Sequence, residues 1–239
     1  MNERPADADT IEETLASSLE SLDDAGNYRD WIADFCVPHL GGSLLEIGAG
    51  HGTFTEVFLE HGDVCAVEPG AFAAKMLAER FVDDERVDVV VGLTEDVDAR
   101  GFDAAVMVNV FEHIDDEVAA LAAVSERLTD GGRLILWVPA FMLLYSPFDK
   151  KLGHHRRYRL RPLVELLEAN GFEVIDRRYT NLPGWFSWLL LVRLLRQEPT
   201  NVVTVQLFDR FVVPVVRWIE SRVCVPFGQS IFLVARRQS

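Results

Sequence analysis

The stretch Leu44–Thr55 has the sequence LLEIGAGHGTFT and decides the fold that we predict for this chain. An apolar run leads into Gly48, Gly50 and Gly52, and residues with helical periodicity follow. Glycine permits a sharp turn and a close approach of the backbone to a ligand, and the start of a helix presents unpaired N–H groups. The pattern therefore indicates a strand, a tight loop and a helix that together bind a small molecule.

Two carboxylates sharpen this interpretation. Glu46 lies two residues before Gly48 at the end of the strand, where a buried carboxylate needs a cationic or hydrogen-bonding partner. Glu68 falls at the tip of the next predicted strand, a position that suits an acceptor for ribose hydroxyls. Nicotinamide-binding folds use the same device, but their fingerprint needs a third glycine where this chain has Thr53. Glu46 would repel a pyrophosphate and attract an ammonium group.

Apolar runs alternate with amphipathic segments on the C-terminal side of this stretch. We predict strands at 43–47, 64–67, 87–91, 104–108, 133–138, 172–175 and 230–235. We predict helices at 27–40, 53–61 and 71–81, one that is capped by Asp115 or Asp116 and stops at Gly131-Gly132, and one that starts at Pro162 and ends at Asn170-Gly171. Strands that alternate with helices indicate an α/β fold with a parallel sheet covered on both faces.

Taken together, the motifs resemble those of the class I S-adenosylmethionine-dependent methyltransferases, from about Tyr28 to Asn181 and again in the final strand. The glycine loop with Glu46 and Glu68 matches the first two motifs of that family. The segments FDAAVMVNVFEHIDD (102–116) and LTDGGRLILWVPA (128–140) resemble its fourth-strand and fifth-strand motifs. The resemblance implies a doubly wound, seven-stranded, mostly parallel Rossmann-like sheet with an antiparallel last strand.

The resemblance also implies S-adenosylmethionine as the cofactor, and together with the positions of the strand ends it leads to our predicted set of binding residues. These are Glu46, Gly48, Ala49, Gly50, Gly52, Glu68, Pro69, Thr94, Glu95 and Asn109. The chain departs from the family at Leu93, where many members carry an aspartate that accepts from the adenine amino group. We therefore expect the adenine contact to come from the Thr94 backbone or from Glu95.

The run His154-His155-Arg156-Arg157-Tyr158 falls between the fifth strand and the next helix, on the expected acceptor side. It is either a solvated basic loop that pairs with the acidic half of the chain or a lid whose arginines bind an anionic acceptor. We predict His154 and Tyr158 as the catalytic residues. Glu112-His113 either caps a helix or fills a polar pocket. His154 and His155 are adjacent and have no third ligand at suitable spacing in the sequence, so we predict no metal site.

Composition limits the classes of function. The chain has 239 residues, 49% hydrophobic and 26% charged, with a net charge of −15. Residues 1–130 hold 30 acidic and 7 basic side chains, whereas residues 131–239 hold 8 and 16. This acidity argues against a nucleic-acid partner. Three cysteines without a Cys-x-x-Cys pair exclude a disulfide scaffold and indicate a reducing, cytoplasmic setting.

We expect an acidic, mobile leader at 1–26 and one methyltransferase domain at 27–239, with a hydrophobic helical insertion at 182–229. The insertion is a cap, a homodimer interface or a surface for peripheral membrane contact, with Trp185, Trp188 and Trp218 at the boundary. Its uncharged runs are shorter than the roughly 18–20 residues of a spanning helix.

The predicted activity is in-line methyl transfer to a small-molecule, glycan or lipid-linked acceptor. A nicotinamide-dependent oxidoreductase and a non-catalytic, membrane-associated binding module are the alternatives.

Overall fold

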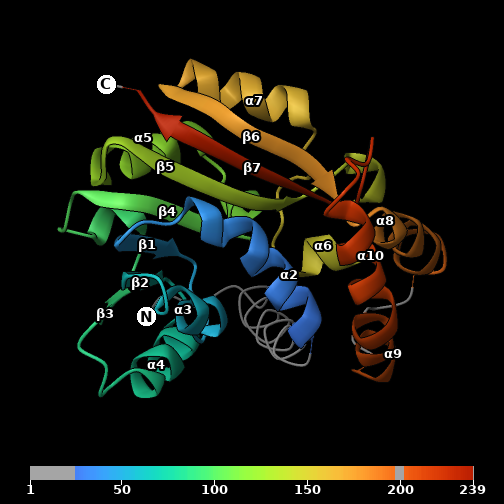
Figure 1. Ribbon diagram of the computed structural model, residues 1–239, viewed down its shortest axis with the longest axis horizontal. Helices are drawn as coiled ribbons and strands as arrows, with labels where there is room; N and C mark the ends of the chain where they lie inside the picture. Colours follow the sequence, from blue (N-terminus) through green and yellow to red (C-terminus); the bar gives the residue numbers. More distant parts are fainter. Residues whose placement is uncertain (1–24, 197–201, 239) are drawn as a thin grey trace, which may run out of the picture.

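A single mixed sheet organises the protein. In the computed structural model, which describes residues 25–196 and 202–238, seven strands lie in the order β3-β2-β1-β4-β5-β7-β6 (Figure 1). Only β7 runs antiparallel to its neighbours, which confirms the predicted doubly wound, mostly parallel sheet. The strands are β1 (Ser43–Ile47), β2 (Asp63–Glu68), β3 (Val87–Val91), β4 (Phe102–Val108), β5 (Leu128–Pro139), β6 (Phe172–Thr180) and β7 (Ser230–Arg237).

Helices cover both faces because side chains alternate along each strand. On one face, Leu44 and its equivalents pack against α2 (Gly26–Cys36), α3 (Thr53–Phe58) and α4 (Ala71–Arg80). On the other face, Leu45 and its equivalents pack against α5 (Glu117–Arg127) and α7 (Leu160–Ala169). Glu46 shares the face of Leu44, so its side chain points toward α3.

Several predicted boundaries are wrong. The strands predicted at 133–138 and 172–175 extend over Leu128–Pro139 and Phe172–Thr180, and the helices predicted at 27–40 and 53–61 end at Cys36 and Phe58. Helix α5 does not reach Gly131-Gly132 but ends at Arg127, because Leu128 already pairs with Phe102 in the sheet. Helix α7 begins at Leu160 and not at Pro162. Proline is tolerated there because the first-turn N–H groups have no partner within the helix. The predicted cap at Asp116 is confirmed, since its carboxylate accepts from the Ala119 N–H at 3.0 Å.

The insertion follows β6 and lies at one end of the sheet, beside α6 (Pro147–Lys151) (Figure 1). It contains α8 (Leu182–Ser187), the π-helical segment η5 (Trp188–Leu194), α9 (Val202–Leu207), the π-helical segment η6 (Phe208–Val212) and α10 (Val213–Glu220). Since β6 runs parallel to β5, its carboxyl end lies at the same edge of the sheet as the glycine loop. The insertion therefore borders the edge at which α/β sheets bind ligands.

Two buried acids attach the insertion to the domain. Asp209 accepts hydrogen bonds from the N–H groups of Asn27 and Tyr28, at 3.1 and 2.8 Å, in the first turn of α2. Glu220 accepts from the N–H groups of Asn181 and Leu182, at 2.9 and 3.0 Å, at the start of α8. Both carboxylates thus supply partners to helix ends that would otherwise lack them.

The expected leader at 1–26 falls almost entirely outside the described residues. Within 25–196 and 202–238, we find no helix that combines the length and the apolar character needed to cross a bilayer.

Candidate active site

Glu46 lies at the end of β1 with its side chain buried against α3. The Thr55 hydroxyl donates a hydrogen bond to Glu46 Oε2 at 2.5 Å. Burial raises the pKa of Glu46 to about 8, although the Thr55 hydrogen bond acts in the opposite direction. A cavity of about 30 Å³ adjoins the carboxylate and is lined by Glu46, Gly48, Ala49, Thr53 and neighbouring apolar side chains. This volume accommodates one or two water-sized groups, so an ammonium group would fit beside the carboxylate.

The glycine loop differs from our expectation of unpaired N–H groups. Gly48 and Ala49 both donate to the Val67 carbonyl, at 2.8 and 3.0 Å, and Gly52 donates to the Ala49 carbonyl at 3.0 Å. These amides hold the loop against β2, so they are not free to bind the carboxylate of a ligand. Gly48 has a φ of 72°, and a Cβ there would lie 2.4 Å from a methyl of Val110. The loop therefore packs directly against the residues that follow β4.

Glu68 is held in place by backbone donors on both sides. Its Oε2 accepts from the Gly50 N–H at 2.8 Å, and its Oε1 accepts from the Gly70 N–H at 2.7 Å. Burial raises its pKa, and the two backbone hydrogen bonds act in the opposite direction. A carboxylate accepts about four hydrogen bonds, so each oxygen retains acceptor capacity for a ribose hydroxyl. Pro69, between the two donors, is exposed.

The remaining cofactor candidates lie at the ends of β3 and β4. The Gly92 N–H donates to the Glu68 carbonyl at 3.1 Å, which places Thr94 and Glu95 just beyond the tip of β2. Thr94 is buried and Glu95 is exposed. Asn109 directly follows β4 with a φ of 53°, a left-handed conformation that asparagine tolerates better than most residues. The structure thus gathers these candidates along one edge of the sheet.

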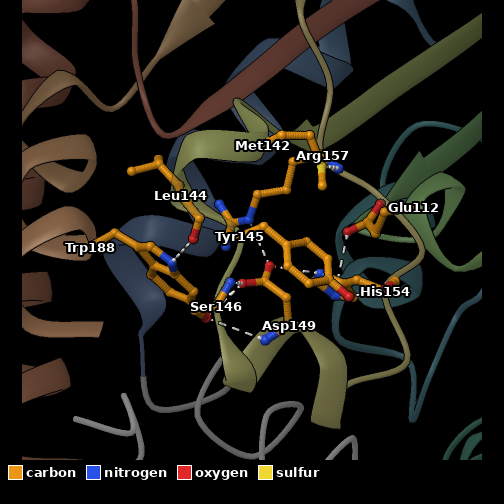
Figure 2. A network of polar contacts seen from close by, with 9 residues as sticks. All are labelled: Glu112, Met142, Leu144, Tyr145, Ser146, Asp149, His154, Arg157 and Trp188. Carbon is orange, nitrogen blue, oxygen red and sulfur yellow. Dashed lines mark hydrogen bonds and ion pairs between the residues drawn. The ribbon is translucent and has the colours of Figure 1, made fainter. Parts of the chain in front are cut away.

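On the acceptor side, His154 belongs to a buried polar network (Figure 2). Its Nδ1 lies 3.1 Å from Asp149 Oδ1. The Arg157 guanidinium donates to the same oxygen at 2.6 Å, and the N–H and hydroxyl of Ser146 donate to Oδ2 at 2.8 and 2.7 Å. Burial acts to raise the pKa of Asp149, but His154, Arg157 and Ser146 together lower it to about 2. Asp149 is therefore a carboxylate, and His154 Nδ1 carries the proton between them.

Glu112 and His113 face this network from the short helix η3 (Phe111–His113), directly after β4. Glu112 is fully buried, and within the described part of the chain neither of its oxygens has a hydrogen-bond partner. Glu112 Oε1 lies 4.0 Å from His154 Nε2, and the His113 and His154 ring centroids are 4.6 Å apart (Figure 2 labels Glu112 and His154). Burial raises the pKa of Glu112 to about 8 and lowers that of His113 to about 3, where neighbouring His154 acts in the same direction.

Tyr158 lies apart from this cluster. Its hydroxyl donates to the Phe111 carbonyl at 3.0 Å, its ring stacks on Phe111, and the side chain is buried in the core. Burial raises its pKa far above the usual range, so the phenol stays protonated. This position favours a packing role and does not support the predicted catalytic one.

Arg156 and Arg157 do not form the anion-binding lid that was one of the two interpretations of the run 154–158. Arg156 pairs with Asp115 and Glu117, and Arg157 pairs with Asp149. For Arg156, the basic loop that pairs with the acidic half is the better description, because both of its partners precede residue 131.

Sequence reasoning missed Asp149 and Ser146, and it assigned Trp188 to the boundary of the insertion without predicting its contact with this network. The available signal was the Ser146-Pro147-Phe148-Asp149 run, a capping box in which Ser146 and Asp149 exchange hydrogen bonds. Trp188 of the insertion donates from Nε1 to the Leu144 carbonyl at 3.1 Å, and the Arg157 guanidinium lies over its ring at 4.8 Å from the centroid. The insertion and the acceptor-side network are therefore in direct contact.

The chain is similar to known methyltransferases. A family model described as a methyltransferase domain matches residues 22–177. The tRNA U34 carboxymethyltransferase of Dichelobacter nodosus is 26% identical in an alignment 164 residues long that covers 61% of this chain. The alignment spans 53% of that relative, so the chain covers about half of its length.

Solved structures share the fold. A possible histamine N-methyltransferase from Thermotoga maritima is 19% identical with a TM-score of 0.64, over 96% of this chain and 98% of that one. The 1,6-didemethyltoxoflavin-N1-methyltransferase of Burkholderia thailandensis, solved with S-adenosylhomocysteine, is 21% identical with a TM-score of 0.60. That alignment covers 97% of this chain and 89% of the other.

Proposed function

The chain belongs to the family of class I S-adenosylmethionine-dependent methyltransferases, and we propose that it methylates an acceptor with an apolar or lipid-linked portion. Residues 27–239 act as one methyltransferase domain in this proposal, and 182–229 form its cap. The observation that carries the choice of acceptor is the contact of Trp188 with the loop that bears His154. This contact joins an apolar surface to the polar network at the ligand-binding edge.

The donor-side residues fit S-adenosylmethionine. The ammonium of its amino-acid tail would meet the Glu46 carboxylate in the adjoining cavity, and its ribose hydroxyls would meet the outward lone pairs of Glu68. Gly48, Ala49, Gly50 and Gly52 provide the shape of the cradle, while Thr94, Glu95 and Asn109 border the adenosine from the neighbouring strand ends. When bound, the cofactor supplies an electrophilic methyl group on a sulfonium.

The chain's own contribution is then mainly positioning. Methyl transfer is an in-line displacement, and holding donor and acceptor about 3 Å apart and aligned lowers the barrier by several kcal/mol. His154 is the side chain that we assign nearest to the acceptor, because Asp149 fixes its ring and leaves Nε2 facing Glu112 and His113. The packing of Gly48 against Val110, two residues before Glu112, supports a short path between the two sites.

The outer face of the insertion supports an apolar acceptor. Large side chains are more than half exposed at Phe186, Leu190, Leu194, Leu195, Leu207, Phe211, Val215 and Trp218. Exposed Arg193, Arg196 and Arg210 lie among them in sequence. Asp209 and Glu220, which in sequence weaken the case for a membrane surface, are buried helix caps. An apolar face with arginines suits the boundary of an anionic lipid layer.

The first experiment is calorimetric titration of the full chain with S-adenosylmethionine, S-adenosylhomocysteine and NAD. We expect heat from the first two and none from NAD. Binding of NAD alone would overturn the proposal.

The second experiment identifies the acceptor class. Methyl-labelled S-adenosylmethionine is incubated with the protein and, separately, a cell lipid extract, a pool of water-soluble metabolites and total tRNA. We expect label in the lipid fraction. Label in tRNA would overturn the acceptor assignment in favour of tRNA, the acceptor named for the Dichelobacter nodosus relative and the second candidate here despite the acidic charge of this chain.

The third experiment tests the membrane contact. We expect the protein to sediment with phosphatidylcholine vesicles that contain phosphatidylglycerol, and Phe211→Ser with Trp218→Ser to reduce that binding at least fivefold. Val82→Ser is the matched control, because Val82 is 76% exposed but lies outside the insertion. If the wild-type protein does not bind vesicles and instead dimerises through Phe211 and Trp218, the surface is a homodimer interface.

A further inference from the structure

Three side chains at the acceptor side converge although two segments supply them. Glu112 and His113 come from η3, and His154 comes from the loop between α6 and α7. One ligand atom from each lies within 4.8 Å of the others. We propose that Glu112, His113 and His154 form a binding site for one divalent transition-metal ion of the Zn²⁺ or Co²⁺ kind. This proposal departs from the expectation of no metal site, which rested on the lack of a third ligand at suitable spacing in the sequence.

Glu112 is the first reason. Its carboxyl group is completely buried, and neither oxygen has a hydrogen-bond partner among residues 25–196 and 202–238. A buried carboxyl group without a hydrogen-bond partner is costly, so such groups are normally paired or bound to a metal. His154 Nε2, 4.0 Å from Oε1, is too far away to donate a hydrogen bond. A cation between the three side chains would supply the partner that Glu112 lacks.

The orientation of His154 is the second reason. Asp149 accepts a hydrogen bond from the Nδ1–H of His154, and this leaves the lone pair of Nε2 directed toward Glu112 Oε1, 4.0 Å away. Arg157 and Ser146 fix Asp149 in turn. Metal-binding histidines almost always donate their other ring N–H in this way, and the second partner sets both tautomer and ring direction. Asp149 is therefore a positioning residue for the site.

The donor set selects the kind of ion. Two imidazoles and one carboxylate suit Zn²⁺ and its neighbours, whereas Mg²⁺ and Ca²⁺ prefer oxygen ligands alone. Ligand atoms around a tetrahedral Zn²⁺ lie about 3.3 Å apart, so small side-chain rotations would close the present spacing. Three protein ligands leave a fourth position open. An oxygen or nitrogen of the acceptor could occupy this fourth position, and that role rests on the proposed function. Binding of the ion itself does not rest on the proposed function.

The test is a titration of the chelator-treated, full-length protein with Co²⁺ and with Zn²⁺ in buffer that contains excess Mg²⁺ to occupy surface carboxylates. We expect one equivalent per chain and a visible Co²⁺ absorption typical of low coordination number. Glu112→Gln and His113→Ala should each weaken affinity at least 100-fold. Asp149→Asn should weaken it 10–100-fold, as second-partner substitutions do.

His155→Ala is the matched control, because His155 is adjacent in sequence and its side chain is 45% exposed. Thermal unfolding with and without metal checks that each variant folds, and the ion should raise the midpoint of the wild type but not of Glu112→Gln. No uptake by the wild type would overturn the inference and favour a water between Glu112 and Arg157 Nη1. Uptake that survives Glu112→Gln and His113→Ala would overturn it as well.

Titration with S-adenosylmethionine separates this inference from the proposed function. Intact cofactor binding without metal uptake overturns only the metal site. Metal uptake without cofactor binding overturns only the proposed function.

Discussion

Glu46 and Glu112 are two buried carboxyl groups at the same edge of the sheet, and their surroundings differ. Burial raises the pKa of each to about 8. Glu46 has the Thr55 hydroxyl as a partner and a small cavity beside it. Glu112 has no hydrogen-bond partner within the described chain, although Asp149 nearby is hydrogen-bonded to His154 and Arg157.

The difference separates groups that have hydrogen-bond partners from a group that lacks them. On the donor side, backbone amides fix the glycine loop and Glu68, and a cavity of about 30 Å³ lies beside Glu46. On the acceptor side, His154, Arg157 and Ser146 form hydrogen bonds with Asp149. The neighbouring Glu112 still lacks a hydrogen-bond partner in the described chain. Substitutions should therefore act mainly on ligand affinity on the donor side and mainly on stability on the acceptor side.

Asp149→Ala should have the largest effect. Removing the carboxylate leaves the buried Arg157 guanidinium without its charge partner, and breaking such a pair costs about 3–5 kcal/mol. Urea unfolding followed by circular dichroism measures the loss. Glu165→Ala, at the exposed pair with Arg161, is the control and should leave the midpoint unchanged. Equal midpoints for wild type and Asp149→Ala would contradict the account of this network.

Glu68→Ala should weaken binding of S-adenosylhomocysteine about 100-fold, and it should also lower stability because the Gly50 and Gly70 N–H groups lose their acceptor. The loss of affinity follows because the ribose hydroxyls no longer donate two hydrogen bonds to the Glu68 carboxylate, each worth about 1.5–3 kcal/mol. Calorimetric titration gives the affinity, with the exposed Glu60→Ala as the control. A change in affinity below threefold would contradict the proposal that Glu68 binds the ribose.

Glu46 should make cofactor affinity depend on pH. The ammonium of S-adenosylmethionine prefers ionised Glu46, but with a pKa of about 8 this group is mostly protonated at neutral pH. Affinity should therefore rise about tenfold per pH unit between roughly pH 6 and pH 8 and then level off. Without cofactor the sign reverses for stability, which falls over the same range because the folded state retains a proton that the unfolded state has lost. Glu46→Gln should flatten both profiles.

Tyr158→Phe should have the smallest effect. It removes the hydrogen bond to the Phe111 carbonyl and should cost about 1 kcal/mol of stability. Methyl transfer into the labelled acceptor fraction should change less than twofold, whereas His154→Ala should abolish it. A large loss of transfer in folded Tyr158→Phe would restore this residue to the catalytic machinery.

Local spacing was enough to predict the donor side. Glu46, Gly48 and Glu68 follow the ends of parallel neighbouring strands, and such ends necessarily meet at one edge of the sheet. The pattern did not predict that the loop amides would be used internally, because the Val67 carbonyl that accepts from Gly48 and Ala49 belongs to another strand. The boundary of α5 was missed for a similar reason, since Leu128 pairs across the sheet with Phe102.

The amino-acid sequence by itself determined the alternation of strands and helices, the gathering of Glu46, Gly48 and Glu68 at one edge of the sheet, and the family, because these follow from periodicity and short-range spacing. Only the tertiary structure decided that Glu112 and His113 face His154, that Tyr158 belongs to the core, and that Asp209 and Glu220 point inward. Each of these depends on contacts between segments distant in the chain, whose side-chain directions are set by packing and by the need of buried polar groups for partners.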